Sequence, residues 1–290
     1  MELKWIFKKL VSKRNKGTHK GDFGHVFILA GSKGMTGAAV LCSKATLRSG
    51  AGLATLGIPS SLNNIIEKKK AIEVMTLPLP ETKESSFSLK GEKRILKKIS
   101  LVDVVLIGPG ISRNSETRKL ILKLIPAIKK PMVLDADALN NIVGNLNILK
   151  NAKAPIVVTP HPGEMARLIN KDTAFIKKNR LIVAKKFSNH YNAVVVLKGK
   201  STVVAKKSSL YINKTGNSGM STAGSGDVLT GMIGGFLAQG LDAFDSARLG
   251  VYLHGLAGDI AAKKKTRIGL IASDILESIP EAISFVIRNA

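Results

Sequence analysis

The chain has 290 residues, 44% of them hydrophobic, which is enough for a packed α/β core and argues against global disorder. No run of about eighteen uncharged apolar residues occurs, and the first twenty residues contain no apolar block, so neither a membrane span nor a signal peptide is predicted. A single cysteine, Cys42, excludes an intrachain disulfide and a cysteine-built metal site. We therefore expect a cytoplasmic protein.

The net charge of +25 allows two interpretations. Lysine and arginine neutralise phosphates, so one hypothesis is a basic nucleic-acid-binding protein. However, the lysines are dispersed along the chain in pairs and triplets, and aromatic residues, which stack on single-stranded bases, make up only 4%. A solvated basic surface is therefore favoured, and no specific nucleic-acid partner is expected.

Short apolar runs alternate with helical stretches, which is typical of an α/β fold. Five of the predicted strands end in loops that carry Gly, Asp, His or Lys, and open α/β sheets bind ligands at the carboxyl ends of their strands. No linker divides the chain, so one domain is predicted. The predicted strands are residues 26–30, 53–58, 72–77, 102–107, 132–134, 156–158 and 194–197. The predicted helices are residues 38–48, 117–128, 228–238, 243–262 and 273–287, with one more beginning at Pro162 or Gly163.

The densest cluster of glycines and small hydroxyl residues covers residues 216–231 and surrounds one carboxylate, Asp227. Glycine lets backbone amides approach a ligand, and a helix that starts near Gly224 would direct its unpaired N–H groups at an anion. Asp227 would lie in the first turn of that helix. A base that takes a proton from a hydroxyl attacking a phosphoryl group fits this arrangement. The alternative is a capped helix that follows a flexible loop.

His161 lies between two prolines at a predicted strand-to-helix junction, where the backbone is rigid. Such a histidine is suited to bind a polar substrate group or to act on a proton. The alternative is a turn histidine bonded to a nearby carbonyl. His254, by contrast, lies among apolar residues of a predicted helix and is interpreted as a packed core histidine.

Other strand ends also carry polar groups. Residues 198–202 offer a cation and hydroxyls to nucleotide phosphates, and they also form a hairpin turn between 194–197 and 202–205. Asp135 and Asp137 are candidates to hold Mg²⁺ through water, and equally candidates to cap the following helix. The glycines of 31–37 match neither the dinucleotide nor the P-loop spacing. Gly108-Pro109-Gly110 after a strand suggests close approach of the backbone to a planar or phosphorylated ligand, and the alternative is an ordinary turn.

Taken in their order along the chain, the motifs resemble those of the ADP/ATP-dependent NAD(P)H-hydrate dehydratases of the ribokinase-like superfamily. The resemblance covers residues 16–279 and implies a ribokinase-like three-layer sandwich, with a mostly parallel central sheet flanked by helices. It further implies a basic lead-in over residues 1–15 and a single dehydratase domain over 16–290, without the epimerase domain of many relatives. The matching stretches are KGDFGH (20–25), 30–45, GPG (108–110), DADAL (135–139), TPHPGE (159–164), LKG (197–199), 216–231 and YLHG (252–255).

The resemblance implies repair of hydrated NADH or NADPH, in which ADP gives AMP and phosphate or ATP gives ADP and phosphate, with Mg²⁺ as cofactor. It makes Asp227 the catalytic base and implies a homo-oligomer, with a tetramer favoured. Ser218 stands where relatives often have proline, which loosens the loop slightly. The implied hydrate-binding residues are Ala39, Gly110, His161 and Asp227. The implied nucleotide-binding residues are Lys198, Gly199, Lys200, Ser201, Thr202, Asn217, Ala223, Gly224, Ser225 and Gly226.

A small-molecule kinase of the same superfamily, of the thiazole or hydroxymethylpyrimidine type, is the alternative among enzymes. It would share Asp227 and the anion-binding loop but would release a stable phosphorylated product. Residues 159–164 together with 20–25 favour the dehydratase.

Overall fold

A nine-stranded sheet crosses the middle of the molecule in the computed structural model, which describes residues 3–289. The order is β3-β2-β1-β4-β5-β6-β7-β8-β9; β1 to β7 are parallel, and β8 and β9 are antiparallel to their neighbours. The mostly parallel sheet is confirmed. The strands are β1 (His25–Leu29), β2 (Leu53–Pro59), β3 (Met75–Leu79), β4 (Val104–Ile107), β5 (Met132–Leu134), β6 (Ile156–Val158), β7 (Val194–Leu197), β8 (Val203–Lys206) and β9 (Ser209–Ile212).

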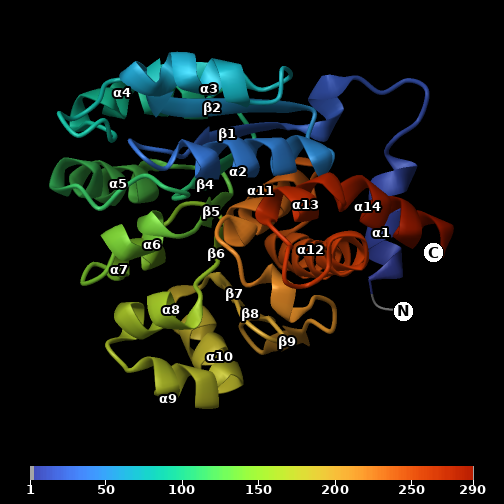
Figure 1. Cartoon of the computed structure of the whole chain (residues 1–290). Coiled ribbons are helices and arrows are strands. Elements are labelled where there is room, and N and C mark those ends of the chain that lie inside the picture. The colour runs from blue at the N-terminus through green and yellow to red at the C-terminus, as the bar shows by residue number, and fades with distance from the viewer. Residues whose placement is uncertain (1–2, 290) are drawn as a thin grey trace.

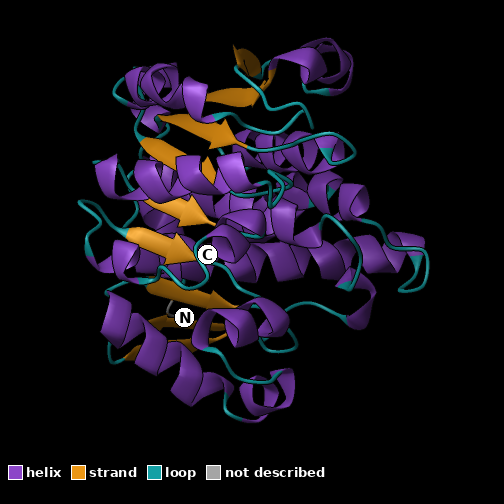
Figure 2. Ribbon diagram, turned by 90° about the vertical axis from the view of Figure 1, so that its left-hand side faces the viewer, coloured by secondary structure: helices purple, strands orange, loops and turns teal. Residues whose placement is uncertain are grey.

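Helices cover both faces of the sheet, because side chains that alternate along each strand are apolar on both sides. One face packs against α4 to α10, and the other against α2, α3, α11 and α12. Figure 2 shows the strands stacked one above another with helices around them. The three-layer sandwich is therefore confirmed. The helices are α1 (Lys4–Ser12), α2 (Thr36–Arg48), α3 (Asn63–Lys69), α4 (Glu92–Ile99), α5 (Ser115–Ala127), α6 (Asp137–Asn141), α7 (Asn147–Lys150), α8 (Pro162–Ile169), α9 (Thr173–Lys178), α10 (Arg180–Tyr191), α11 (Ser225–Ala238), α12 (Ala243–Lys265), α13 (Ala272–Glu277) and α14 (Ile279–Arg288).

Two parallel helices, α2 and α11, pack unusually closely through glycines of α11. A Cβ at Gly231 would collide with the carbonyl oxygen of Cys42, and one at Gly235 would lie 2.7 Å from the carbonyl oxygen of Thr46. Any larger residue at these two positions would push the helices apart. The amino ends of both helices lie at the edge of the sheet where the parallel strands end.

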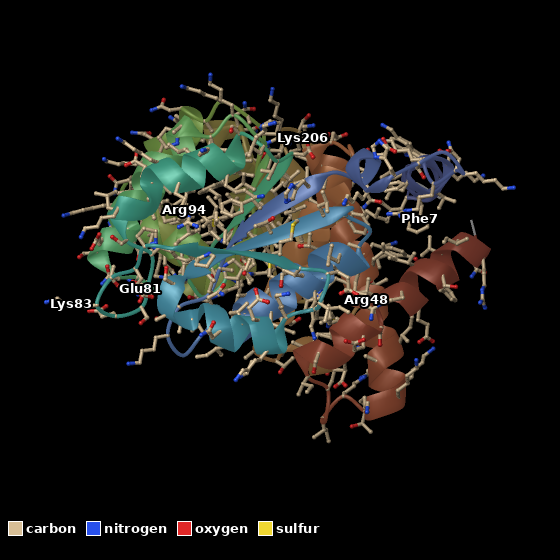
Figure 3. All side chains as sticks on the ribbon, turned by 90° about the horizontal axis from the view of Figure 1, so that it is seen from above. Phe7, Arg48, Glu81, Lys83, Arg94 and Lys206 are labelled. Atoms are coloured by element: carbon tan, nitrogen blue, oxygen red, sulfur yellow. The ribbon has the colours of Figure 1, made fainter. Side chains whose placement is uncertain are left out.

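The residues expected as a lead-in, 1–15, include a helix that the sequence interpretation did not predict. On α1, Ile6, Phe7 and Leu10 are buried in a cluster with side chains of α11, α12, α13 and α14, so α1 packs against the helical layer of the sandwich. Figure 1 shows α1 beside α14, close to the carboxyl terminus, and Figure 3 labels Phe7 on this helix. Arg14 then donates to the carbonyl of Gly50, which attaches the following segment to the end of α2.

Two element predictions are wrong in detail. The strand expected at 72–77 lies at Met75–Leu79, because Ile72 belongs to a turn and is 90% exposed. The helix expected at 273–287 is two helices, α13 and α14, that meet at Ser278. Pro280 explains the break, since it has no N–H for a continuous helix but suits the first turn of a new one.

Basic side chains project from many elements. In the view of Figure 3, the labelled Arg48, Lys83, Arg94 and Lys206 lie on well-separated parts of the molecule. This distribution agrees with a dispersed basic surface. Among residues 3–289, no helix is long and apolar enough to cross a bilayer.

Candidate active site

A cavity of about 840 Å³ opens where the strands β6 and β7 end. Its walls come from the loops after β6, β7 and β9, from the amino end of α11 and from one side of α12. This is the edge of an open parallel sheet at which ligands bind, as the sequence predicted. The lining residues are His161, Lys198 to Thr202, Asn213 to Ser218, Met220 to Thr222, Ser225, Gly226, Leu229, Val251, His254, Gly255 and Arg267.

The helix predicted to start near Gly224 is α11, and Gly224 is its N-cap in the left-handed conformation (φ +89°). No side chain caps this end. The amide of Ser225 donates to the carbonyl oxygen of Thr222 at 3.4 Å, and the next amides of the first turn are available to an anion. Asp227 lies in the first turn. Burial and then the charge of Asp135 raise the pKa of Asp227 to about 7, which suits a base that works near neutral pH.

Asp135 is buried at the end of β5 and accepts hydrogen bonds from three other elements. Its Oδ1 accepts from Thr159 Oγ1 and from Lys198 Nζ, each at 2.7 Å, and its Oδ2 accepts from Thr230 Oγ1 at 2.8 Å. Thr230 lies one turn after Asp227 on α11, so Asp135 ties the helix of the candidate base to the loops of the cavity.

Lys198 places its ammonium between two carboxylates and above the amino end of α11. Besides Asp135, its Nζ lies 3.9 Å from Glu164 Oε2, and it would lie 3.2 Å from a Cβ at Gly226. These carboxylates raise the pKa of Lys198 more than burial lowers it, so the group stays cationic. A cation beside exposed amide N–H groups is suited to a nucleotide phosphate.

His161 both caps α8 and lines the cavity. Its Nδ1 accepts hydrogen bonds from the amides of Gly163 (3.0 Å) and Glu164 (3.3 Å), while Glu164 Oε2 accepts from the amide of His161 at 2.7 Å. This reciprocal pair is a capping box. Burial, followed by the charges of Lys198 and Arg167, lowers the pKa of His161, so the ring is neutral near pH 7. Because Nδ1 is an acceptor, the ring proton is on Nε2, which lies 3.5 Å from Glu164 Oε1. Nε2 is therefore the atom that can contact a ligand.

The predicted nucleotide-binding residues fall into two groups. Residues 198–202 form the predicted turn between the antiparallel strands β7 and β8, and all five line the cavity. Asn217, Ser225 and Gly226 line it from the other side, whereas Ala223 and Gly224 are adjacent along the chain without lining it. The side chain of Asn217 is committed to the protein, since it donates to Gly258 and Asp259 and accepts from Gly219.

Two of the predicted hydrate-binding residues, Ala39 and Gly110, lie elsewhere, at the point between β1 and β4 where the strand order reverses. A Cβ at Gly110 (φ +64°) would lie 2.8 Å from Met35 Cβ, so α2 begins directly over this loop. Ala39 is fully buried, and neither residue lines the 840 Å³ cavity. Ala39 therefore belongs to the packed core beneath the region between β1 and β4 and does not present its side chain to a ligand there.

The carboxylates of Asp135 and Asp137, the candidates to hold Mg²⁺ through water, already accept hydrogen bonds from the protein. The carboxylate of Asp135 is used by Thr159, Lys198 and Thr230, and that of Asp137 accepts from the amide of Ser112 (3.0 Å) and from Asn140 Nδ2 (3.2 Å). Within residues 3–289, no group of three or more His, Cys, Asp or Glu side chains is arranged to hold a metal.

His254 is buried, as predicted, but it is more than a core residue. It lines the cavity, and its Nε2 lies 3.3 Å from Ser225 Oγ at the start of α11. Burial lowers the pKa of His254 to about 4, so it is neutral at physiological pH.

The sequence interpretation also missed the roles of Thr159 and Thr230. The spacing of three residues from Asp227 places Thr230 on the same helix face and could have indicated it.

Together, the fold and the site define an α/β protein of ribokinase-like architecture, in which a carboxylate and an open helix amino end adjoin a cavity at the carboxyl edge of the sheet. A family model described as NAD(P)H-hydrate dehydratase matches residues 26–281. The chain belongs to the NAD(P)H-hydrate dehydratase family.

Individual relatives agree. The chain is 44% identical to the bifunctional NAD(P)H-hydrate repair enzyme of Moorella thermoacetica over 98% of this chain and 53% of that protein. It is 33% identical to the ADP-dependent (S)-NAD(P)H-hydrate dehydratase of Neisseria meningitidis over 93% of this chain and 88% of that one. The chain thus spans about half the length of the bifunctional relatives.

Among solved structures, the ADP/ATP-dependent NAD(P)H-hydrate dehydratase of Bacillus subtilis, co-crystallised with ATP and Mg²⁺, superimposes with a TM-score of 0.80 at 27% identity. This superposition covers 97% of the present chain and 98% of the other.

Proposed function

We propose that this chain dehydrates the S-form hydrate of NADH or NADPH back to NADH or NADPH, at the expense of ADP or ATP. The observation that carries the proposal is Asp227, a carboxylate with a pKa of about 7 in the first turn of a helix whose amino end is open to an anion. The proposal is a lyase reaction, so the alternative of a kinase that releases a phosphorylated product is not favoured by the family match.

In the first step, ionised Asp227 takes the proton from the ring hydroxyl as the hydroxyl oxygen bonds to the terminal phosphorus of the nucleotide. The bond from that phosphorus to the nucleotide breaks, which gives AMP from ADP or ADP from ATP. The amides at the start of α11, with Lys198, stabilise the charge of the transferring group. The ring carbon then releases phosphate, a far better leaving group than hydroxide, while its neighbour loses a proton and the dihydronicotinamide double bond re-forms.

The residues divide between the two ligands. Residues 198–202 with Asn217 and residues 223–226 would hold the nucleotide. The cavity lined by 198–202, Asn217, Ser225 and Gly226 supports this assignment. Ala39, Gly110 and His161 would form the hydrate side, with Asp227 between the two. Mg²⁺ would be carried by the nucleotide phosphates and water, with Asp135 and Asp137 as candidates to hold it through water.

Three predictions remain as proposals. Residues 16–290 act as one dehydratase domain, the protein works in the cytoplasm, and it assembles as a homo-oligomer, with a tetramer favoured. Light scattering on the purified protein measures the last of these.

The deciding assay incubates the protein with NADH hydrate and either ADP or ATP and follows the absorbance of restored NADH. Inorganic phosphate should appear in equal amount. A stable phosphorylated hydrate without recovery of NADH would support the kinase instead.

A further inference from the structure

Arg180, the first residue of α10, lies behind the turn of residues 198–202. Its Nη2 donates to the carbonyl oxygen of Leu197 at 2.8 Å, and its Nη1 donates to the carbonyl oxygen of Lys200. Arg180 does not line the cavity, whereas Lys200 does. One guanidinium therefore holds the start and the middle of the turn from outside the cavity.

The turn needs such support, because its backbone is held in uncommon conformations. Gly199 has φ +134° and Ser201 has φ +54°, and a non-glycine residue in the left-handed region persists where its surroundings hold it. Within residues 3–289, the amide N–H groups of Gly199, Lys200 and Ser201 make no hydrogen bond in the turn or to neighbouring loops. These donors are available to a ligand.

The position of Arg180 also sets the direction of one of these donors. In a trans peptide the C=O and N–H groups point in opposite directions, and the chain has no cis peptide among its described residues. Because Arg180 holds the carbonyl of Lys200, the N–H of Ser201 points away from Arg180, and Ser201 lines the cavity.

We infer that Arg180 is a positioning residue for the adenine nucleotide, which fixes the turn of residues 198–202 so that its amides face the ligand. The inference rests on the proposed function, in which this turn binds the nucleotide. Arginine suits the task because its planar fork donates to two carbonyls at once, whereas the ammonium of lysine is a compact donor on a flexible stem.

The test compares Arg180→Ala and Arg180→Lys with Lys185→Ala, an exposed lysine on the same helix. We expect the Kd and KM for ADP to rise about tenfold or more in Arg180→Ala, because two bonds to a charged donor are lost, and to rise less in Arg180→Lys. The KM for the hydrate and kcat at saturating ADP should stay within about twofold, and Lys185→Ala should match the wild type. Equal losses in kcat and in both KM values, or normal ADP affinity in folded Arg180→Ala, would overturn the inference. If Arg180→Ala does not fold, Arg180→Gln is measured in its place against the same outcomes.

A second measurement separates this inference from the proposed function. Hydrogen exchange of residues 198–202 in the wild type should slow when ADP is added. Absence of protection while ADP binds elsewhere would contradict both the nucleotide assignment and the role of Arg180. Normal protection in the wild type together with unchanged ADP affinity in Arg180→Ala would overturn the role of Arg180 alone.

Discussion

The ammonium of Lys198 lies 2.7 Å from the buried carboxylate of Asp135, directly over the amino end of the helix that carries Asp227. The same Asp135 raises the pKa of Asp227 while its partner Lys198 lowers it. The pKa of the candidate base therefore depends on an ion pair between the residues that follow β5 and β7.

The role of Asp227 can be tested by Asp227→Asn. The amide keeps the shape of the side chain but takes up no proton, so turnover should fall by at least about a hundredfold, while nucleotide affinity stays within a few-fold. Single-turnover kinetics and calorimetry with ADP measure the two quantities. Near-normal turnover would show that Asp227 is not the base.

The raised pKa of Asp227 also predicts two dependences on pH. A base must be ionised, so kcat/KM should rise with pH through an apparent pKa of about 7. Folded Asp227 holds a proton between about pH 4 and 7 that the unfolded chain has released, so its contribution to stability falls across this window and is lowest above pH 7.

Asp227→Asn has no carboxyl to ionise at this position, so it does not lose stability in this way as the pH rises. From pH 5 to pH 8, its free energy of unfolding should therefore gain about 1 kcal/mol or more relative to wild type, as urea melts at each pH would show. A constant difference between the two proteins across this range would mean that the pKa of Asp227 is close to that of a free carboxyl.

Asp135→Asn should move the pH profile. Loss of this charge removes the largest electrostatic contribution that raises the pKa of Asp227, so the rising limb of kcat/KM should shift to lower pH. Asp137→Asn is the matched control, since its charge raises the same pKa less strongly and its shift should be smaller. Equal shifts in the two variants would show that the ion pair does not tune the base.

His161 caps α8 and is proposed to bind the hydrate, and two variants separate these roles. His161→Ala should lose about 1 kcal/mol of stability through the missing N-cap and should also weaken hydrate binding. His161→Asn retains a cap acceptor, so its stability should approach that of the wild type while hydrate binding stays weak. Thermal melts and calorimetry with each ligand test this, and normal hydrate affinity in His161→Asn would leave His161 with the cap alone.

Salt should act mainly on binding. Screening reduces steering by the dispersed positive charge, with a Debye length of about 8 Å at physiological ionic strength, so KM values should rise with salt while kcat changes little. Labelled duplex DNA should bind weakly and without sequence preference in fluorescence anisotropy. Tight, sequence-selective binding at physiological salt would reveal a nucleic-acid function.

The fold and the position of Asp227 were predictable because their signals are local. Apolar runs mark the strands, and the glycine cluster around Asp227 marks the open helix end. The bond between Asp135 and Thr230 joins residues 95 positions apart, and no spacing in the sequence indicates it. Lysines around Ile6 and Phe7 concealed α1, on which Ile6, Phe7 and Leu10 are buried because α12 and α14 pack against this helix.

The glycine contacts between α2 and α11 have a mechanical consequence. These helices are parallel and interlocked through Gly231 and Gly235, so their amino ends, one beside Gly110 and the other carrying Asp227, move as a unit. These contacts oppose sliding of one helix along the other, so helix packing fixes the distance between the two amino ends. Closure of the proposed site around its ligands would therefore have to come from the loops that face these helices, with the α2–α11 pair as its rigid side.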